Sequence, residues 1–180
     1  MRTIAFLQRR PDLSRAAFRA HYEEHHAPLA LPLLEGLRHY VRNHRLDDDE
    51  GARAAGALPF DAISEFEYAS RGAFDAMRAR VASDEGAALR ADELRFMHKP
   101  GNHYFAATLE PASDAVRPAP GTAAKWIVLA RSRPDAGRAA LRDRVREAAI
   151  RLERSGHATA ERIDVAQDGD RPRPAAYDMR

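Results

Sequence analysis

The chain has 180 residues, no cysteine, and a formal net charge of +2 from 29 basic and 27 acidic side chains. Nearly balanced charge argues against nucleic acid as the main partner. The lack of cysteine excludes disulfides and thiolate chemistry. No apolar stretch approaches the ~20 residues of a membrane span, and no signal-like segment opens the chain. We therefore expect a cytoplasmic protein without a membrane partner.

The first third of the chain reads as strand, helix and strand. Apolar alternation over 4–9 predicts a strand, and Ser14 is a good N-cap for the helix that follows. The helical face is predicted to contain Phe18, Tyr22, His25 and Leu29. This spacing buries His25. Pro28 cannot donate a backbone hydrogen bond, so the helix is expected to loosen near His26.

Alternating strands and helices continue to about residue 110. A strand is predicted over 37–46, followed by an acidic and glycine-rich loop over 47–56 and a strand over 60–68. Next come a helix capped by Ser70 and ending near 81, a helical segment over 84–94, and a strand over 96–109. The resulting order, β-α-β-β-α-β, is the ferredoxin-like arrangement of the α+β class. We therefore expect residues 1–110 to form a complete domain.

A repeat predicts a second, partial copy of this unit. The turn and helix start at Arg10–Arg19 reappear without a gap at Arg133–Arg142. We expect a linker over 111–122 and a partial ferredoxin-like repeat over 123–180, with a strand over 125–131, a helix over 137–155 and a strand over 157–166. We expect the copy to be partial, because its match to the first copy stops where a third strand would begin. Two open sheet faces can stack into an α/β-barrel, and we expect this barrel to form either within the chain or through a homodimer.

One short motif on the first helix has the spacing of a metal site. His21 to His25 spells H-x-x-E-H, in which two histidines one turn apart can hold zinc. Such a short match arises by chance, and the predicted face buries His25, so we expect no metal. The sequence contains neither G-x-G-x-x-G nor G-x-S-x-G. Nucleotide binding and serine hydrolysis therefore have no support.

Two longer motifs carry a family resemblance. They are Phe18-x3-Tyr22-x3-His26-Ala27-Pro28-Leu29 and Gly36-Leu37-Arg38-His39-Tyr40-Val41-Arg42-Asn43-His44. Together with Asp61–Tyr68 and Asp92-Glu93-x-x-Phe96, they resemble the EthD family, named after ethyl tert-butyl ether degradation. The resemblance covers roughly residues 2–109. One departure is His98, which stands where the family often has an acidic residue.

The resemblance implies a dimeric α/β-barrel and a small-molecule substrate. Relatives in the wider superfamily include cofactor-independent monooxygenases, isomerases, decarboxylases and haem-handling enzymes, so the fold alone selects no reaction. The resemblance implies His26 as a catalytic residue, since an imidazole titrates near neutrality. The alternative is that His26 only caps the end of its helix or bonds a loop carbonyl.

The strand over 37–46 supplies the other candidates. Tyr40, Arg42 and His44 share one face; if that face looks into the barrel, His44 would be catalytic and Tyr40 and Arg42 would bind substrate oxygens. If the face is exposed to solvent, these residues are surface side chains without a functional role. Glu65 is the predicted acidic partner, with a surface salt bridge as its alternative.

We therefore expect an EthD-like enzyme that acts on an apolar oxygenated molecule of aromatic, polyketide or lactone-like type. The chemistry would be metal-free acid–base catalysis of oxygenation, decarboxylation or isomerisation, with no cofactor. Two alternatives stay open: a non-catalytic barrel that binds a hydrophobic metabolite, and a haem-handling protein.

Overall fold

The computed structural model describes residues 1–45, 60–110, 137–154 and 163–166. These residues divide at Thr108 into two compact units, each of which is described by itself. The loop expected over 47–56, the linker over 111–122 and the strand over 125–131 lie outside the described residues.

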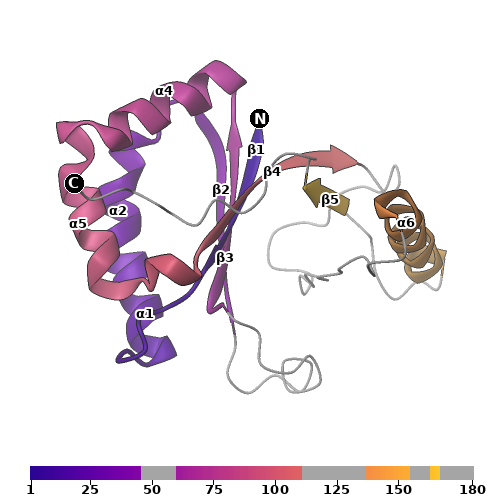
Figure 1. Ribbon diagram of the computed structural model, residues 1–180, viewed down its shortest axis with the longest axis horizontal. Helices are drawn as coiled ribbons and strands as arrows, with labels where there is room; N and C mark the ends of the chain where they lie inside the picture. Colours follow the sequence, from indigo (N-terminus) through magenta and orange to yellow (C-terminus); the bar gives the residue numbers. More distant parts are fainter. Residues whose placement is uncertain (46–59, 111–136, 155–162, 167–180) are drawn as a thin grey trace. The chain divides into compact units, whose positions relative to one another are not determined.

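The first unit is built on an antiparallel sheet (Figure 1). Its strands are β1 (Arg2–Leu7), β2 (Leu37–His44), β3 (Ala62–Tyr68) and β4 (His103–Glu110), in the order β2-β3-β1-β4. β1 is central and pairs along its length with both β3 and β4; Ala5, for example, lies opposite Ser64 and Tyr104. The expected α+β class and β-α-β-β-α-β order are therefore confirmed.

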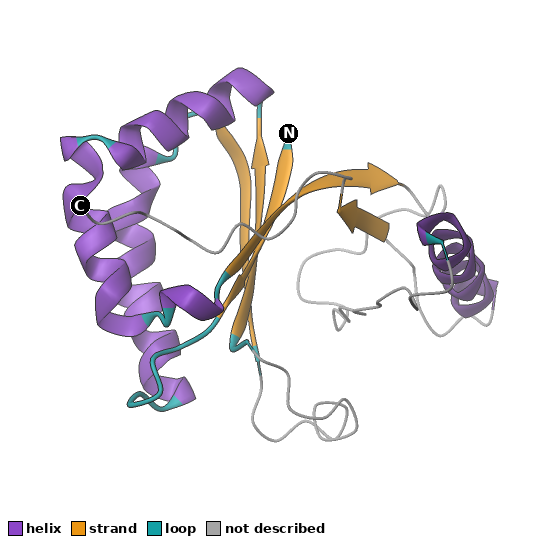
Figure 2. Cartoon of the chain, viewed as in Figure 1, coloured by secondary structure: helices purple, strands orange, loops and turns teal. Residues whose placement is uncertain are grey.

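Helices cover one face of this sheet (Figure 2). They are α1 (Arg15–His21), α2 (Ala27–Ala30), α4 (Arg71–Ala82) and α5 (Ala87–Phe96). Both predicted caps are present. The Ser14 hydroxyl accepts a hydrogen bond from the Ala17 amide at 3.1 Å, and the Ser70 hydroxyl accepts one from the Ala73 amide at 3.0 Å. These hydroxyls satisfy amides that the first helical turn leaves without a partner.

The fourth strand begins later than predicted. Phe96 ends helix α5, a 3-10 turn follows at Lys99–Gly101, and β4 starts only at His103. The buried residues of α5 are Leu89, Asp92 and Phe96, which are spaced three and four apart as on a helix face. Phe96 is fully buried and packs 5.4 Å from Phe18, so tertiary packing holds it in the helix.

Apolar side chains fill the space between the helices and the sheet in two clusters. One contains Ala5, Leu7, Phe18, Tyr22, Ala27, Ala62, Phe96 and Met97, and the other contains Ala30, Leu33, Leu34, Tyr68, Met77 and Leu89. Gly36, in the turn before β2, has a φ of +75°, and a Cβ there would lie 2.7 Å from the Cβ of Ala73. Only glycine combines this conformation with so close an approach to α4.

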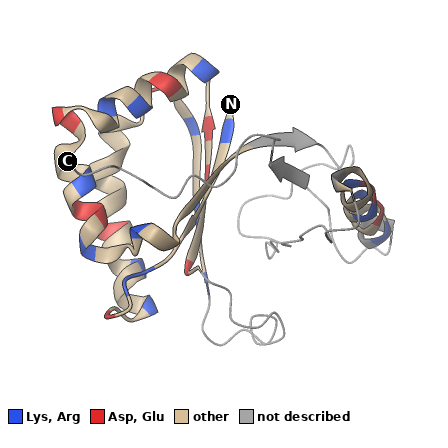
Figure 3. Cartoon of the chain, viewed as in Figure 1, with Lys and Arg blue, Asp and Glu red and all other residues tan. Residues whose placement is uncertain are grey.

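The second unit contains α6 (Arg138–Arg154), which is the helix expected over 137–155, and most of β5 (Ile163–Ala166). The partial repeat, the barrel and the homodimer remain predictions. Basic and acidic residues are interspersed along the helices of the first unit (Figure 3). Within the described ranges, no helix is both long and apolar enough to cross a bilayer.

Candidate functional site

The helix after Ser14 changes its winding where Pro28 was expected to loosen it. A π-helical turn spans Tyr22–His26, and the Ala27 amide donates to the carbonyl of Tyr22, five residues earlier. The wider turn moves His26 onto the buried face, where it is 5% exposed, and leaves His25 exposed. The prediction that His25 is buried is therefore wrong, because regular helical spacing does not hold across this turn.

The π turn brings two histidines to one carboxylate. Asp92 of α5 accepts a hydrogen bond from Nε2 of His21 at 2.9 Å through Oδ1, and from Nδ1 of His26 at 3.0 Å through Oδ2. In a regular α-helix, residues five apart lie about 140° apart around the axis. An i→i+5 turn returns them toward the same side, so both imidazoles reach Asp92. Asp92 itself is buried.

These contacts fix the proton positions on the two rings. A carboxylate only accepts hydrogen bonds, so each imidazole donates to Asp92. Burial lowers the pKa of His26 below its ordinary value, against the opposing effect of the Asp92 hydrogen bond, and His26 is therefore neutral at pH 7. When His21 is also neutral, its Nε2 carries the proton and its Nδ1 is the free base.

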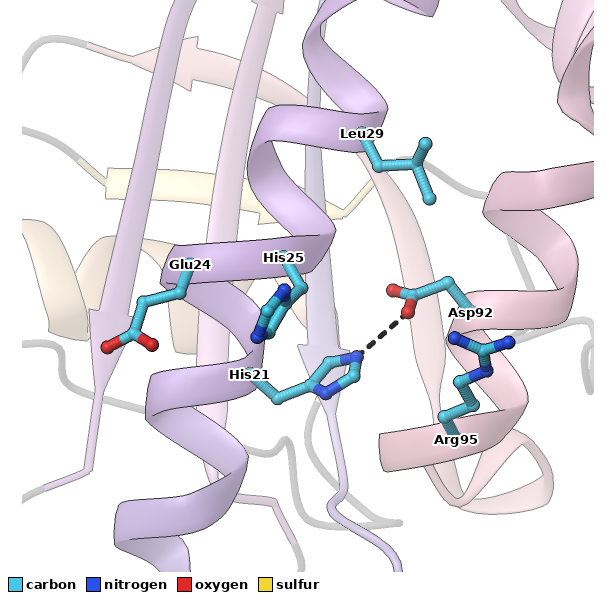
Figure 4. Close-up of a pocket in the computed structure, with 6 residues that line it drawn as sticks. All are labelled: His21, Glu24, His25, Leu29, Asp92 and Arg95. Carbon is cyan, nitrogen blue, oxygen red and sulfur yellow. Dashed lines mark hydrogen bonds and ion pairs between the residues drawn. The ribbon is translucent and has the colours of Figure 1, made fainter.

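His21 lies at the edge of an open cavity of about 460 Å³, which we call the α1–α5 groove (Figure 4). Its lining residues are His21, Glu24, His25, Leu29, Asp92 and Arg95. Asp92 and Arg95 project from α5, and the other four come from the helical segment on the facing wall. The groove therefore offers an imidazole base that a buried carboxylate holds in place.

The H-x-x-E-H pattern lies in this groove without forming a metal site. His21 uses Nε2 to bond Asp92, and the side chain of Glu24 points away from α5 (Figure 4). Within the part of the chain that the structure describes, no group of three or more His, Asp or Glu side chains is placed to hold a metal ion.

Comparison with known proteins identifies the family of the chain. A family model of the EthD domain matches residues 10–100, just over half of the chain. The chain belongs to the EthD family. A similar solved structure is that of an ethyl tert-butyl ether degradation (EthD) family protein from Bacillus halodurans, with 26% identity and a TM-score of 0.40. That match covers 55% of this chain and 89% of the other. A search among curated proteins gives no match.

The strand candidates of the EthD domain face the helices, not the opposite side of the sheet. Tyr40 Oη lies 2.8 Å from Tyr22 Oη, and Glu23 pairs with Arg42 at 2.7 Å and with His44 at 2.6 Å. Of the two orientations that the sequence left open, a barrel interior and the solvent, neither describes these side chains, because they contact the helical segment. Sequence alternation defines two faces of a strand but does not say which face the helices cover.

The acidic partner of these residues also differs from the prediction. Glu65 lies on the other face of the sheet, where it accepts a hydrogen bond from Asn43 Nδ2 at 2.8 Å. Glu23 takes the partner's place from the π turn. Hydrogen bonds from Arg42, helped by one from His44, lower the pKa of Glu23 to about 2. The group of Glu23, Arg42 and His44 therefore ties the helix to β2.

Hydroxyl groups continue this buried polar layer. Tyr22 Oη lies 2.7 Å from Ser64 Oγ, as well as beside Tyr40. Burial raises the pKa of both tyrosines above the ordinary value, so they stay protonated at neutral pH. Tyr22, Tyr40 and Ser64 thus act as hydrogen-bonding groups inside the EthD domain.

Proposed function

We propose that this EthD-family protein is a small enzyme that transfers protons on an oxygenated organic molecule bound in the α1–α5 groove. The observation that carries the proposal is the 2.9 Å hydrogen bond from His21 to the buried Asp92, at the edge of a cavity. A carboxylate that orients an imidazole is a common arrangement for a general acid–base. Leu29, which is 38% exposed, supplies an apolar contact for the substrate.

In this proposal the three acid–base residues have different roles. His21 Nδ1 removes a proton from a carbon next to a carbonyl group, which leaves an enolate, and then returns the proton to the same or another carbon. Asp92 holds the ring of His21 in place and stabilises the imidazolium that forms. His26 bonds the other oxygen of Asp92 and does not line the groove, so it acts as a positioning residue. His44 supports the helix through Glu23.

Isomerisation and cofactor-independent oxygenation begin with removal of a proton next to a carbonyl group, whereas decarboxylation loses CO2 to leave the same enolate, which is then protonated. Exchange of that proton with solvent is therefore the most direct test of the step that these reactions share. The purified full chain would be incubated in D2O with enolisable ketones, β-keto acids, lactones and phenols. Incorporation of deuterium would be followed by proton NMR, which needs no knowledge of the final product.

We expect His21→Gln to lower the exchange rate by about 10²-fold or more, as for loss of a general base. His39→Gln is the matched control, since His39 lies on β2 and does not line the groove. The proposal would be overturned by wild-type exchange rates in His21→Gln. Absence of exchange with every member of the panel would equally count against it.

A further inference from the structure

The α1–α5 groove holds a guanidinium group that is available to a ligand. Arg95 has no hydrogen bond or ion pair with any residue that the structure describes, although it lines the cavity. Some arginines of this unit have carboxylate partners, such as Arg10 with Asp12 at 2.9 Å and Arg80 with Glu85 at 3.0 Å, whereas Arg95 has none among the described residues and also lines a cavity. The Arg95 side chain lies beside Asp92 on α5 (Figure 4).

The acids of the groove leave this guanidinium free. Asp92 uses one oxygen for His21 and the other for His26, at 2.9 and 3.0 Å. The side chain of Glu24 points away from α5 and from Arg95 (Figure 4). A guanidinium group presents a planar fork of donors that matches a carboxylate in a bidentate pair. The open ligand position next to Arg95 therefore favours an anionic oxygen pair.

The remaining lining suits an acid with a small apolar body. Leu29 is 38% exposed on the facing wall, and the ring of His25 lies 5.2 Å from that of His21. The cavity volume of about 460 Å³ falls within the range of small-molecule sites. We infer that the groove binds small organic carboxylic acids, with the carboxylate on Arg95 and the apolar part against Leu29. This inference rests on the proposed function, since it takes the groove as the substrate site.

The charge of Glu24 gives the inference a second consequence. Glu24 lines the same groove and has no hydrogen-bond partner among the described residues, so its carboxylate repels a bound anion. Removing this charge while keeping the side-chain shape should strengthen carboxylate binding. Arg95 and Glu24 would then act in opposite directions on the same ligand, whereas a purely apolar groove would respond to neither change.

The test compares benzoate with benzamide, which has nearly the same shape and no charge. Each would be titrated into the ¹⁵N-labelled full chain at pH 7, and the dissociation constant taken from amide chemical shifts. We expect benzoate to bind about ten-fold more tightly than benzamide, as for a charge-assisted bidentate pair. Arg95→Gln should remove this preference, and Glu24→Gln should increase benzoate affinity about two- to three-fold. Arg78→Gln is the matched control, since Arg78 is exposed on α4 and does not line the groove.

Equal affinities for benzoate and benzamide, or an unchanged preference in Arg95→Gln, would overturn the inference. So would an absence of benzoate binding. His21→Gln separates this outcome from failure of the proposed function. If that variant binds benzoate normally and also keeps normal deuterium exchange, the carboxylate site stands and the catalytic role of His21 is wrong. If exchange is lost but benzoate binds no better than benzamide, the catalytic role stands and the substrate class is wrong.

Discussion

Glu23 allows a quantitative test of how the helix is fastened to the sheet. The Glu23 carboxylate accepts one bifurcated hydrogen bond from Arg42 Nε, which lies 2.9 Å from both of its oxygens, and one from Arg42 Nη2 at 2.7 Å, and it pairs with His44 at 2.6 Å. We consider the change Glu23→Gln, which keeps the shape of the side chain and removes its charge. The Arg42 contacts then lose most of their strength, because charge-assisted hydrogen bonds are stronger than neutral ones.

The size of the effect follows from the pKa of Glu23, which falls from 4.5 to about 2. Linkage converts this difference into a ceiling of about 3.4 kcal/mol of folding free energy. The Glu23 side chain is 34% exposed, and solvent screens such a pair, so we expect about 1 kcal/mol. Because the folded pKa is depressed, this stabilisation is complete above pH 4.5 and is lost as the pH falls toward 2.

The assay is urea unfolding followed by far-UV circular dichroism at pH 7, 5, 4 and 3. Glu24→Gln is the control, since it removes the same charge from the neighbouring position. The free energy of unfolding of Glu23→Gln should be about 1 kcal/mol lower than that of wild type at pH 7, and this difference should decrease below pH 4.5. The reasoning is refuted if Glu23→Gln matches Glu24→Gln at pH 7, or if its deficit is the same at pH 7 and pH 3.

Two further predictions concern His26 and Gly36. Burial lowers the pKa of His26, so the folded state resists protonation and stability should fall as the pH drops below about 6.5. The His26→Asn side chain can still donate to Asp92 and does not titrate. This variant should therefore show a weaker dependence of the urea-unfolding midpoint on pH between pH 8 and pH 5, and an unchanged dependence would contradict the prediction. Gly36→Ala should lower the free energy of unfolding by more than about 1 kcal/mol in the same assay, because the positive φ and the 2.7 Å approach to Ala73 both oppose a Cβ. A deficit no larger than that of Gly72→Ala, where a Cβ would meet only Ser70 Oγ at 3.7 Å, would rule this out.

The parts of the fold that depend on local chemistry were predictable from the sequence. Ser14 and Ser70 mark helix starts because their hydroxyls bond amides three residues away. The order of the elements along the chain, β-α-β-β-α-β, could likewise be predicted from the alternating strand and helix patterns. The start of β4 was not predictable in the same way, since Phe96 has high strand propensity and is held in α5 by packing against Phe18.

The candidate site depends on contacts that no local pattern contains. Asp92 lies 66 residues after His26, and only the folded chain brings the two together. The H-x-x-E-H pattern drew attention to the segment that lines the proposed site, because His21, Glu24 and His25 all line the groove. The orientation of Arg42 likewise required knowledge of which sheet face the helices cover.

The π turn also affects how EthD sequences should be compared. A turn with i→i+5 bonding is equivalent to one extra residue inserted into an α-helix. In a relative whose helix is regular, the residue that occupies the place of His26 would be found one position earlier, where His25 stands here. A correct alignment therefore places a one-residue gap inside the helix, between Tyr22 and His26. Without that gap, counting along the chain assigns the buried partner of Asp92 to the wrong histidine.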